Sequence, residues 1–228
     1  MGQNKRAIIV FGGWDGHQPE LVSARAEKLL LSHGFKVKLY DTLDVYEDSE
    51  ELLKNDLIVS LWTQGMLTEA QEKGVTEAVA AGVGIAGCHG GMCDSFRHNT
   101  QWEFMTGGKW ISHPGSSGIT YEVNIKHSSS PLTEGISDFQ VTSEHYFLHV
   151  DPAVEVLATT RFPNSGAIWY HSSNSKFDEP VCWTKRWGRG RVYYTSLGHI
   201  DEVFEIVPEA QELFLRGMLW ASESEQDC

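Results

Sequence analysis

The stretch Gly84-Ile85-Ala86-Gly87-Cys88-His89-Gly90-Gly91-Met92 decides the fold, because a short apolar run leads directly into a glycine-flanked Cys-His pair. In an open parallel sheet, ligands bind at the carboxyl ends of the strands, so a residue on a sharp turn there is aimed at a pocket. Gly87 and Gly90 supply backbone freedom, as in the Gly-x-Ser-x-Gly elbow that presents a nucleophile. We therefore expect Cys88 or His89 at a pocket. The alternative is a tight turn with a buried thiol and a hydrogen-bonded imidazole.

Strands and helices alternate on the amino-terminal side of this stretch. Residues 7–11 are continuously apolar, which predicts a strand buried on both faces and hence a parallel sheet. Apolar side chains then recur at helical spacing from Pro19 to a closing Gly34. The further expected elements are strands at 35–40, 56–61 and 83–87, a short helix at 47–53, and a helix at 68–81 with Thr68 as its N-cap. The alternation predicts an α/β fold with a right-handed, flavodoxin-like parallel sheet flanked by helices.

The pattern changes after Cys88, where Gly, Ser, His and Trp become frequent. We expect residues 88–130 to be an insertion that covers the pocket. Strands are predicted at 119–125, 139–141 and 154–159, an antiparallel hairpin at 181–186 and 191–196 near the C-terminus, and a final helix at 208–221. With 41% hydrophobic residues the chain can bury a large core, and it has no internal repeat. We therefore expect residues 1–228 to form a single domain.

The charge distribution restricts the partners. The net charge is −13, and it is spread over the chain without a large basic cluster, so neither nucleic acid nor an anionic membrane is an expected partner. The hairpin turn 185–191 is locally basic, and it is either an anion site or a solvated turn. The spacing of the four cysteines is typical neither of a zinc site nor of a disulfide framework, so we expect reduced thiols. The polar start of the sequence and the absence of a long apolar segment favour a cytoplasmic protein.

Histidines recur at predicted strand ends and in the loops that follow them. Imidazole is the commonest metal ligand and moves protons near neutral pH, so convergence of these loops predicts a metal site or an acid/base site. A divalent ion, zinc or manganese, is the expected cofactor. Glu144 and Asp15 are the carboxylates expected nearest this group, as a general base or as partners that orient an imidazole. The expected metal ligands are His17, His89 and His149.

Aromatic and polar residues near the same loops suggest a small-molecule substrate, since aromatic rings stack on the apolar faces of sugars. The expected substrate-binding residues are Trp14, Asp15, Trp62, His113 and Tyr146. No Gly-x-Gly-x-x-Gly and no Walker A sequence follows the first strand, so no nucleotide cofactor is expected. A homo-oligomer is the default for an α/β protein of this size.

Five motifs, in this order and spacing, together resemble the trehalose-utilisation (ThuA-like) family over nearly the whole chain. They are Gly12-Gly13-Trp14-Asp15-Gly16-His17, Gly87-Cys88-His89-Gly90-Gly91-Met92, Gly107-Gly108-Lys109-Trp110 followed by His113-Pro114-Gly115, Ser143-Glu144-His145-Tyr146 with His149-Val150-Asp151-Pro152, and residues 183–199. The resemblance implies a class I glutamine amidotransferase-like fold, in proteins associated with bacterial uptake and oxidation of trehalose and related disaccharides.

The resemblance also bears on the catalytic residues. Amidotransferases of this class carry a catalytic Cys at the elbow, where Cys88 falls. Their later His-x-Glu is not evident, since His199 is followed by Asp201 instead. ThuA-like proteins do not generally present a Cys at the elbow, so the resemblance favours His89 as the functional residue.

The sequence therefore supports three hypotheses. The first is a protein of disaccharide or keto-sugar metabolism, a His-based and metal-assisted hydrolase or isomerase that uses His89, Glu144 and His199. The second is a thiol hydrolase resembling an amidotransferase, in which Cys88 attacks an acyl carbon with His199. The third is a sugar-binding accessory protein without catalytic activity.

Overall fold

The computed structural model describes residues 5–126, 130–162 and 175–223. Cys228 lies outside these residues, and the other three cysteines are free thiols. The first half of the chain contains β1 (Arg6–Gly13), η1 (Asp15–His17), α1 (Pro19–Ser32), β2 (Lys36–Tyr40), η2 (Asp44–Glu47), α2 (Ser49–Leu52), β3 (Leu57–Thr63), α3 (Glu69–Ala80), β4 (Gly84–Cys88), α4 (Gly90–Cys93), α5 (Thr100–Thr106) and β5 (Gly108–Ser112).

The second half supplies the remaining strands and two helices. It contains η3 (Ser116–Gly118), β6 (Ile119–Ile125), β7 (Phe139–Ser143), β8 (Phe147–Val150), β9 (Glu155–Phe162), β10 (Phe177–Trp187), β11 (Gly190–Thr195), α6 (Asp201–Ile206) and α7 (Pro208–Ala221).

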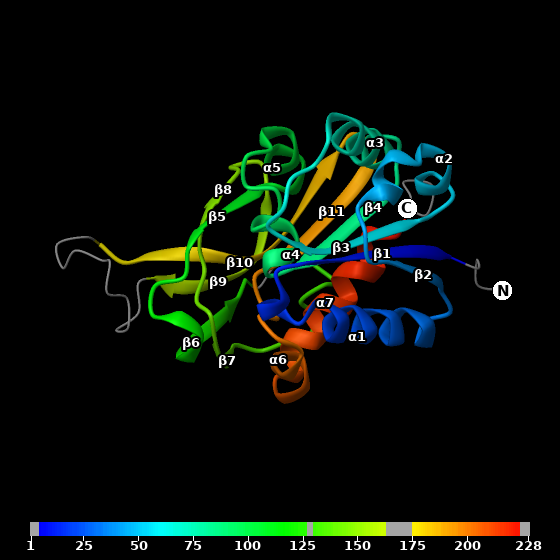
Figure 1. Cartoon of the computed structure of the whole chain (residues 1–228). Helices are drawn as coiled ribbons and strands as arrows, with labels where there is room; N and C mark the ends of the chain where they lie inside the picture. The colour runs from blue at the N-terminus through cyan, green and yellow to red at the C-terminus, as the bar shows by residue number, and fades with distance from the viewer. Residues whose placement is uncertain (1–4, 127–129, 163–174, 224–228) are drawn as a thin grey trace.

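One large sheet runs through the molecule in the order β2-β1-β3-β4-β11-β10-β9-β6-β7 (Figure 1). The pairs from β2 to β11 are parallel, which confirms the flavodoxin-like core. The pairs from β11 to β7 are antiparallel, so the predicted C-terminal hairpin continues the same sheet rather than standing apart. A second, two-stranded antiparallel sheet pairs β5 with β8. The carboxyl ends of the five parallel strands meet at one edge.

Helices cover both faces of the parallel half. Figure 1 shows α1, α6 and α7 on one face and α2, α3 and α5 on the other. Along β1, Ala7 and Ile9 belong to one buried cluster, while Ile8 and Val10 belong to the other. A strand buried on both faces has to be apolar at every position, which explains the continuous apolar run at residues 7–11.

The predicted elements of the first 88 residues agree closely with the structure. Thr68 caps α3 as expected, because its hydroxyl accepts from the Gln71 amide and the Gln71 side chain accepts in turn from the Thr68 amide. The sequence does not predict α4, α5, β5, β8 and α6. These elements have four to seven residues, too few for a periodic apolar pattern to stand out.

Residues 88–130, which we expect to be an insertion that covers the pocket, include several helices and strands. The chain from α4 to β5 passes along the carboxyl edge of the parallel strands, and β5 packs with β8 there. β6 is a strand of the main sheet, between β9 and β7. The segment thus connects the parallel half to the antiparallel half.

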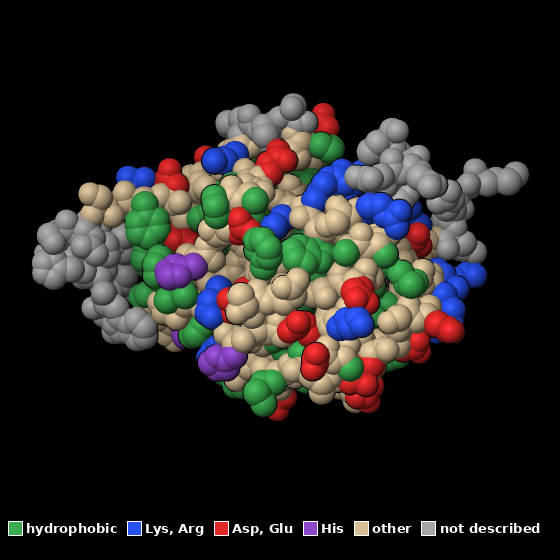
Figure 2. Space-filling model, turned by 90° about the horizontal axis from the view of Figure 1, so that it is seen from above, with side chains coloured by type: hydrophobic (Ala, Val, Ile, Leu, Met, Phe, Trp, Pro, Cys, Tyr) green, Lys and Arg blue, Asp and Glu red, His purple; other side chains and the backbone are tan. Residues whose placement is uncertain are grey.

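Charges of both signs are interspersed on the surface seen from above, with hydrophobic side chains exposed among them (Figure 2). Phe104 and Met66 are among the large hydrophobic side chains exposed to solvent. In the described ranges, each of the helices is too short or too polar to cross a membrane.

Candidate functional site: a buried histidine-glutamate cluster

Four side chains from four separate loops meet at the carboxyl edge of the sheet. His17 lies in η1 after β1, His89 follows β4, His199 follows β11, and Glu144 joins β7 to β8. One ligand atom from each of these residues lies within 4.8 Å of the others. His17, His89 and Glu144 are buried and His199 is half-buried. We call this group the His-Glu cluster.

His89 occupies the sharp turn that the sequence predicts. Its backbone has φ 49° and ψ −121°, a left-handed conformation that is strained for a residue with a side chain. Its amide donates to the Thr195 carbonyl oxygen at 2.7 Å, and its own carbonyl oxygen accepts from the Tyr194 hydroxyl at 2.8 Å. The ring stacks on Tyr146, with 4.0 Å between the ring centres. The elbow therefore presents His89, and Cys88 is the last residue of the strand before it.

The hydrogen bonds of His89 fix its tautomer. Nδ1 lies 2.8 Å from the Ser196 carbonyl oxygen, and because a carbonyl only accepts, Nδ1 has to carry a proton. In the neutral ring, Nε2 then has a lone pair, and it lies 3.1 Å from Oε2 of Glu144. Two acceptors at this distance repel unless a proton or a cation lies between them. A second proton on the His89 ring or a bound cation between the two atoms would remove this repulsion.

The other contacts converge on the same carboxylate oxygen. Oε2 of Glu144 lies 3.5 Å from Nδ1 of His199 and 4.0 Å from Nε2 of His17. Nδ1 of His199 is 3.3 Å from Nε2 of His89. In a tetrahedral zinc site with bonds of about 2.0–2.1 Å, neighbouring ligand atoms are roughly 3.4 Å apart. The observed separations run from 3.1 Å to 4.8 Å, so these three imidazole nitrogens and one carboxylate oxygen could hold a metal ion.

Burial keeps two of the imidazoles neutral. It lowers the pKa of His17 to about 2, with further lowering by the neighbouring His89 and His199. Burial, together with His89, lowers the pKa of His199 to about 4. For Glu144, burial alone would raise the pKa, but the close contact with His89 and the nearby histidines lower it below its ordinary value. Neutral imidazoles and an ionised carboxylate are the protonation states that bind metals.

Groups behind the cluster hold its members in place. Nδ1 of His17 lies 2.9 Å from the hydroxyl of Thr63 at the end of β3. The Tyr121 hydroxyl donates to the main-chain carbonyl oxygen of Glu144 at 3.1 Å. Such outer partners orient metal ligands and fix their tautomers. Neither residue stood out in the sequence, because only the fold brings Thr63 and Tyr121 next to the cluster.

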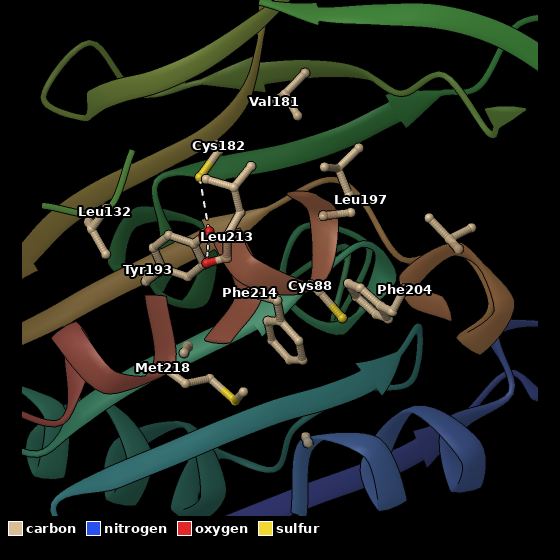
Figure 3. Close-up of a cluster of buried hydrophobic side chains, with 14 of the residues drawn as sticks. Cys88, Leu132, Val181, Cys182, Tyr193, Leu197, Phe204, Leu213, Phe214 and Met218 are labelled. Carbon is tan, nitrogen blue, oxygen red and sulfur yellow. Dashed lines mark hydrogen bonds between the residues drawn. The ribbon is translucent and has the colours of Figure 1, made fainter. Parts of the chain in front are cut away.

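Cys88 has hydrophobic surroundings. It is 3% exposed and belongs to the same core cluster as Phe204 and Phe214, beside which Figure 3 draws it. Burial raises the pKa of its thiol well above the ordinary value. A reactive thiolate needs a lowered pKa and an approach for the substrate, and these contacts provide neither.

The residues expected to bind substrate lie at different distances from the cluster. Tyr146 stacks on His89, and the Trp14 ring meets His17 edge-on at 4.7 Å. His113 is half-exposed, with Nδ1 3.7 Å from Oε1 of Glu144. Trp62 is half-buried and packs over Gly12, next to η1. Asp15 is exposed at the start of η1 and is not a member of the cluster.

His149 does not join the other expected metal ligands. It is exposed on β8, opposite Lys109 of β5, and its ring packs edge-on against Phe147. The fourth position of the cluster is filled by His199, which the sequence analysis assigned to catalysis. Spacing along the chain could not distinguish the two, because only the strand register decides that His149 points away.

Basic side chains of the C-terminal hairpin have structural partners. Lys185 pairs with Asp151, Arg189 donates to the Ala81 carbonyl oxygen, and Arg191 pairs with Glu223. These contacts hold the hairpin to its neighbours and argue against an anion site, and Lys185 and Arg191 are buried rather than solvated.

The fold and the position of the site define the class of protein. A mostly parallel sheet with a strained elbow at the end of β4 is the arrangement of the glutamine amidotransferase-like superfamily. The ThuA family model, described as trehalose utilisation, matches residues 6–221. The chain therefore belongs to the ThuA family.

Solved structures share this fold. A ThuA-like protein from Bacteroides uniformis has a TM-score of 0.78 at 18% identity, over 99% of this chain and 94% of that one. A ThuA-like protein from Parabacteroides merdae has a TM-score of 0.74 at 17% identity, over 99% and 93%. A cytoplasmic protein from Salmonella typhimurium has a TM-score of 0.65 at 11% identity, over 96% and 100%. No curated protein matches the chain.

Proposed function

We propose that this ThuA-family protein is a metal-assisted enzyme of sugar metabolism, acting as a hydrolase or isomerase on trehalose, a related disaccharide or a keto derivative. The family supports a role connected with trehalose utilisation. The observation that supports the metal is the convergence of three imidazoles on Glu144, with Nε2 of His89 3.1 Å from Oε2 of the carboxylate. A cytoplasmic location is part of the proposal.

The cluster would hold the ion through His17, His89, Glu144 and His199. A bound divalent metal supplies Lewis acidity toward a sugar carbonyl or hydroxyl. Stacking on Tyr146 and the bond to Ser196 keep the His89 ring in one orientation. A rigid ligand set of this kind favours a single coordination geometry.

Proton transfer is assigned to Glu144 and His113. Oε1 of Glu144 points to the half-exposed His113 at 3.7 Å, whereas Oε2 faces the three histidines of the cluster. The two oxygens thus have different surroundings. His113 lies at the solvent side, where it can exchange a proton taken from the substrate with water.

Metal content is the decisive measurement. Protein purified without a His-tag or chelator should contain close to one zinc or manganese ion per chain by mass spectrometry. The His89→Ala variant should lose it, whereas His149→Ala should keep it, since His149 is an exposed histidine outside the cluster. Metal-free protein, or equal loss in both variants, contradicts the proposal.

Turnover of a sugar substrate tests the proposed catalytic activity. Trehalose and its keto derivative are offered to the metal-loaded protein and to the Glu144→Gln and His113→Ala variants. We expect conversion by the wild type, at least 100-fold loss in Glu144→Gln, and a smaller loss in His113→Ala. Sugar binding without turnover would instead select a sugar-binding accessory protein.

A further inference from the structure

An arginine lies at the rim of the site, at the end of a series of aromatic rings in contact with one another. Tyr146 stacks on His89, and the Trp110 ring meets Tyr146 at 6.3 Å and His113 at 5.7 Å. The guanidinium of Arg97 covers the Trp110 ring, with 4.2 Å from its carbon to the ring centre. The aromatic wall therefore runs from the His-Glu cluster to Arg97.

Arg97 is held rigidly. Its Nε and Nη2 both donate to the carboxylate of Asp94, and the Trp110 ring supports the guanidinium plane. Asp94 is 3% exposed, whereas the Arg97 side chain is 37% exposed. A planar fork fixed in this way loses little conformational entropy when it binds a ligand.

Hydrogen-bonding groups along this wall lack partners. Over the described parts of the chain, no group accepts from Nη1 of Arg97, whose side chain is partly exposed. Nε1 of Trp110 and Nδ1 of His113 are shielded from solvent and have no hydrogen-bond partner, and Oε1 of Glu144 lies 3.7 Å from Nδ1 of His113. Unsatisfied buried polar groups are rare in folded proteins and point to an absent water or ligand. Two donors and an imidazole nitrogen on one wall suit a ligand with several hydroxyl groups, which donate as well as accept hydrogen bonds.

The charge of the wall distinguishes between classes of ligand. The ionised Asp94 directly compensates Arg97, so the pair has no net charge. An anionic ligand would gain little from this neutral pair, because its own negative charge would lie close to the carboxylate of Asp94. A neutral polyhydroxylated ligand needs donors without net charge, which is what the wall offers.

We propose that Arg97, fixed by Asp94 and Trp110, binds the hydroxyl groups of a neutral sugar and selects it over an anionic sugar. The inference rests on the proposed function, since it names the substrate class of the same site. Arg97 is a substrate-binding and specificity-determining residue in this assignment. Trp110 contributes a further donor, and His113 a further hydrogen-bonding nitrogen.

Calorimetric binding of trehalose and of glucuronate to the metal-loaded full chain tests the inference. The wild type should prefer trehalose. Arg97→Gln should weaken trehalose binding by about tenfold, the loss of roughly one charge-assisted hydrogen bond. The matched control is Arg216→Gln, which removes an ion pair with Glu212 on α7. It should leave trehalose binding unchanged.

A second variant changes the net charge of the Asp94–Arg97 pair from zero to positive. Asp94→Asn leaves Arg97 uncompensated, so the preference for trehalose over glucuronate should fall by about tenfold. Unchanged trehalose binding in Arg97→Gln, an unchanged preference in Asp94→Asn, or a wild type that does not prefer trehalose would each overturn the inference. Circular dichroism and metal content of the same samples confirm that the variants are folded and loaded.

The two proposals fail separately. Protein that contains no metal but binds trehalose through Arg97 contradicts the metal-assisted enzyme and leaves the inference standing. Metal-loaded protein that binds glucuronate at least as tightly as trehalose overturns the inference and leaves the metal site standing.

Discussion

The ring of His89 is fixed from three sides, by the Ser196 carbonyl, by Tyr146 and by Glu144. A strained backbone persists only where the surroundings determine it strongly, and such strain concentrates at functional sites. The sequence left Cys88 and His89 as alternatives, because both precede Gly90. The backbone decides between them, since the elbow conformation belongs to His89 and the strand ends at Cys88.

Thr63 provides a test of the groups behind the cluster. Thr63→Val removes the hydroxyl that meets Nδ1 of His17 while keeping the shape of the side chain. We expect at least tenfold weaker metal binding in a chelator competition, the usual cost of losing an outer partner. Thr76→Val is the control, because the Thr76 hydroxyl bonds only carbonyl oxygens within α3. Equal affinities in both variants would show that Thr63 does not orient His17.

Cys88 provides a test of thiol chemistry. Its thiol is buried among hydrophobic side chains, and burial raises its pKa. Iodoacetamide should leave Cys88 of the native protein unmodified and its activity intact. Cys88→Ala should keep its metal and lose about 1 kcal/mol of stability from the smaller side chain. Inactivation by alkylation at Cys88 would instead favour the thiol hydrolase.

At the scale of elements, local signals were sufficient where a helix or strand is long and begins or ends with a clear motif. The capping box of α3 and the Pro19 start of α1 are examples. Short elements such as β5 and β8 depend on each other, since each is stabilised mainly by its partner strand. Their sequences alone lack a distinctive pattern.

The N-cap of α3 gives a prediction about an element. Thr68→Ala removes the acceptor for the Gln71 amide, and we expect the free energy of unfolding to fall by about 1 kcal/mol. Thr68→Ser retains the hydroxyl and should keep most of the stability. Urea denaturation of both variants checks this. A Thr68→Ala variant as stable as the wild type would show that the cap contributes nothing measurable.

At the scale of the whole molecule, the site exists because the sheet brings distant loops to one edge. Its four members come from residues 17, 89, 144 and 199, and the parallel strands β1, β4 and β11 direct three of them to the same place. Glu144 comes from the antiparallel half, at the end of β7. Both halves of the sheet therefore contribute residues to the cluster.

A buried acid in the antiparallel half makes stability depend on pH. Glu179 on β10 is 2% exposed, accepts from the Leu148 amide on β8, and has its pKa raised to about 8 by burial. Between about pH 4.5 and 8 the unfolded chain has lost this proton, while the folded protein keeps it. The native state then binds more protons, so this residue lowers stability progressively as the pH rises through that window.

Glu179→Gln removes this dependence and keeps an oxygen for the Leu148 amide. The variant should match the wild type near pH 4 and exceed its stability by on the order of 1–3 kcal/mol near pH 8. Thermal or urea unfolding across the pH range measures the difference. Glu122→Gln, at an exposed position on β6, is the control. A difference that does not grow with pH would show that Glu179 is ionised in the folded protein.

The sequence by itself determined the parallel core, the hairpin and the elbow, because these depend on apolar runs, glycines and caps that are local in the chain. It also supplied the histidines at the strand ends and Glu144. The tertiary structure alone decided that His199 rather than His149 completes the cluster, and that Asp94 and Trp110 hold Arg97 at its rim. Strand register and the packing of distant segments determine which side chains meet, and neither is encoded in the spacing of residues along one stretch of chain.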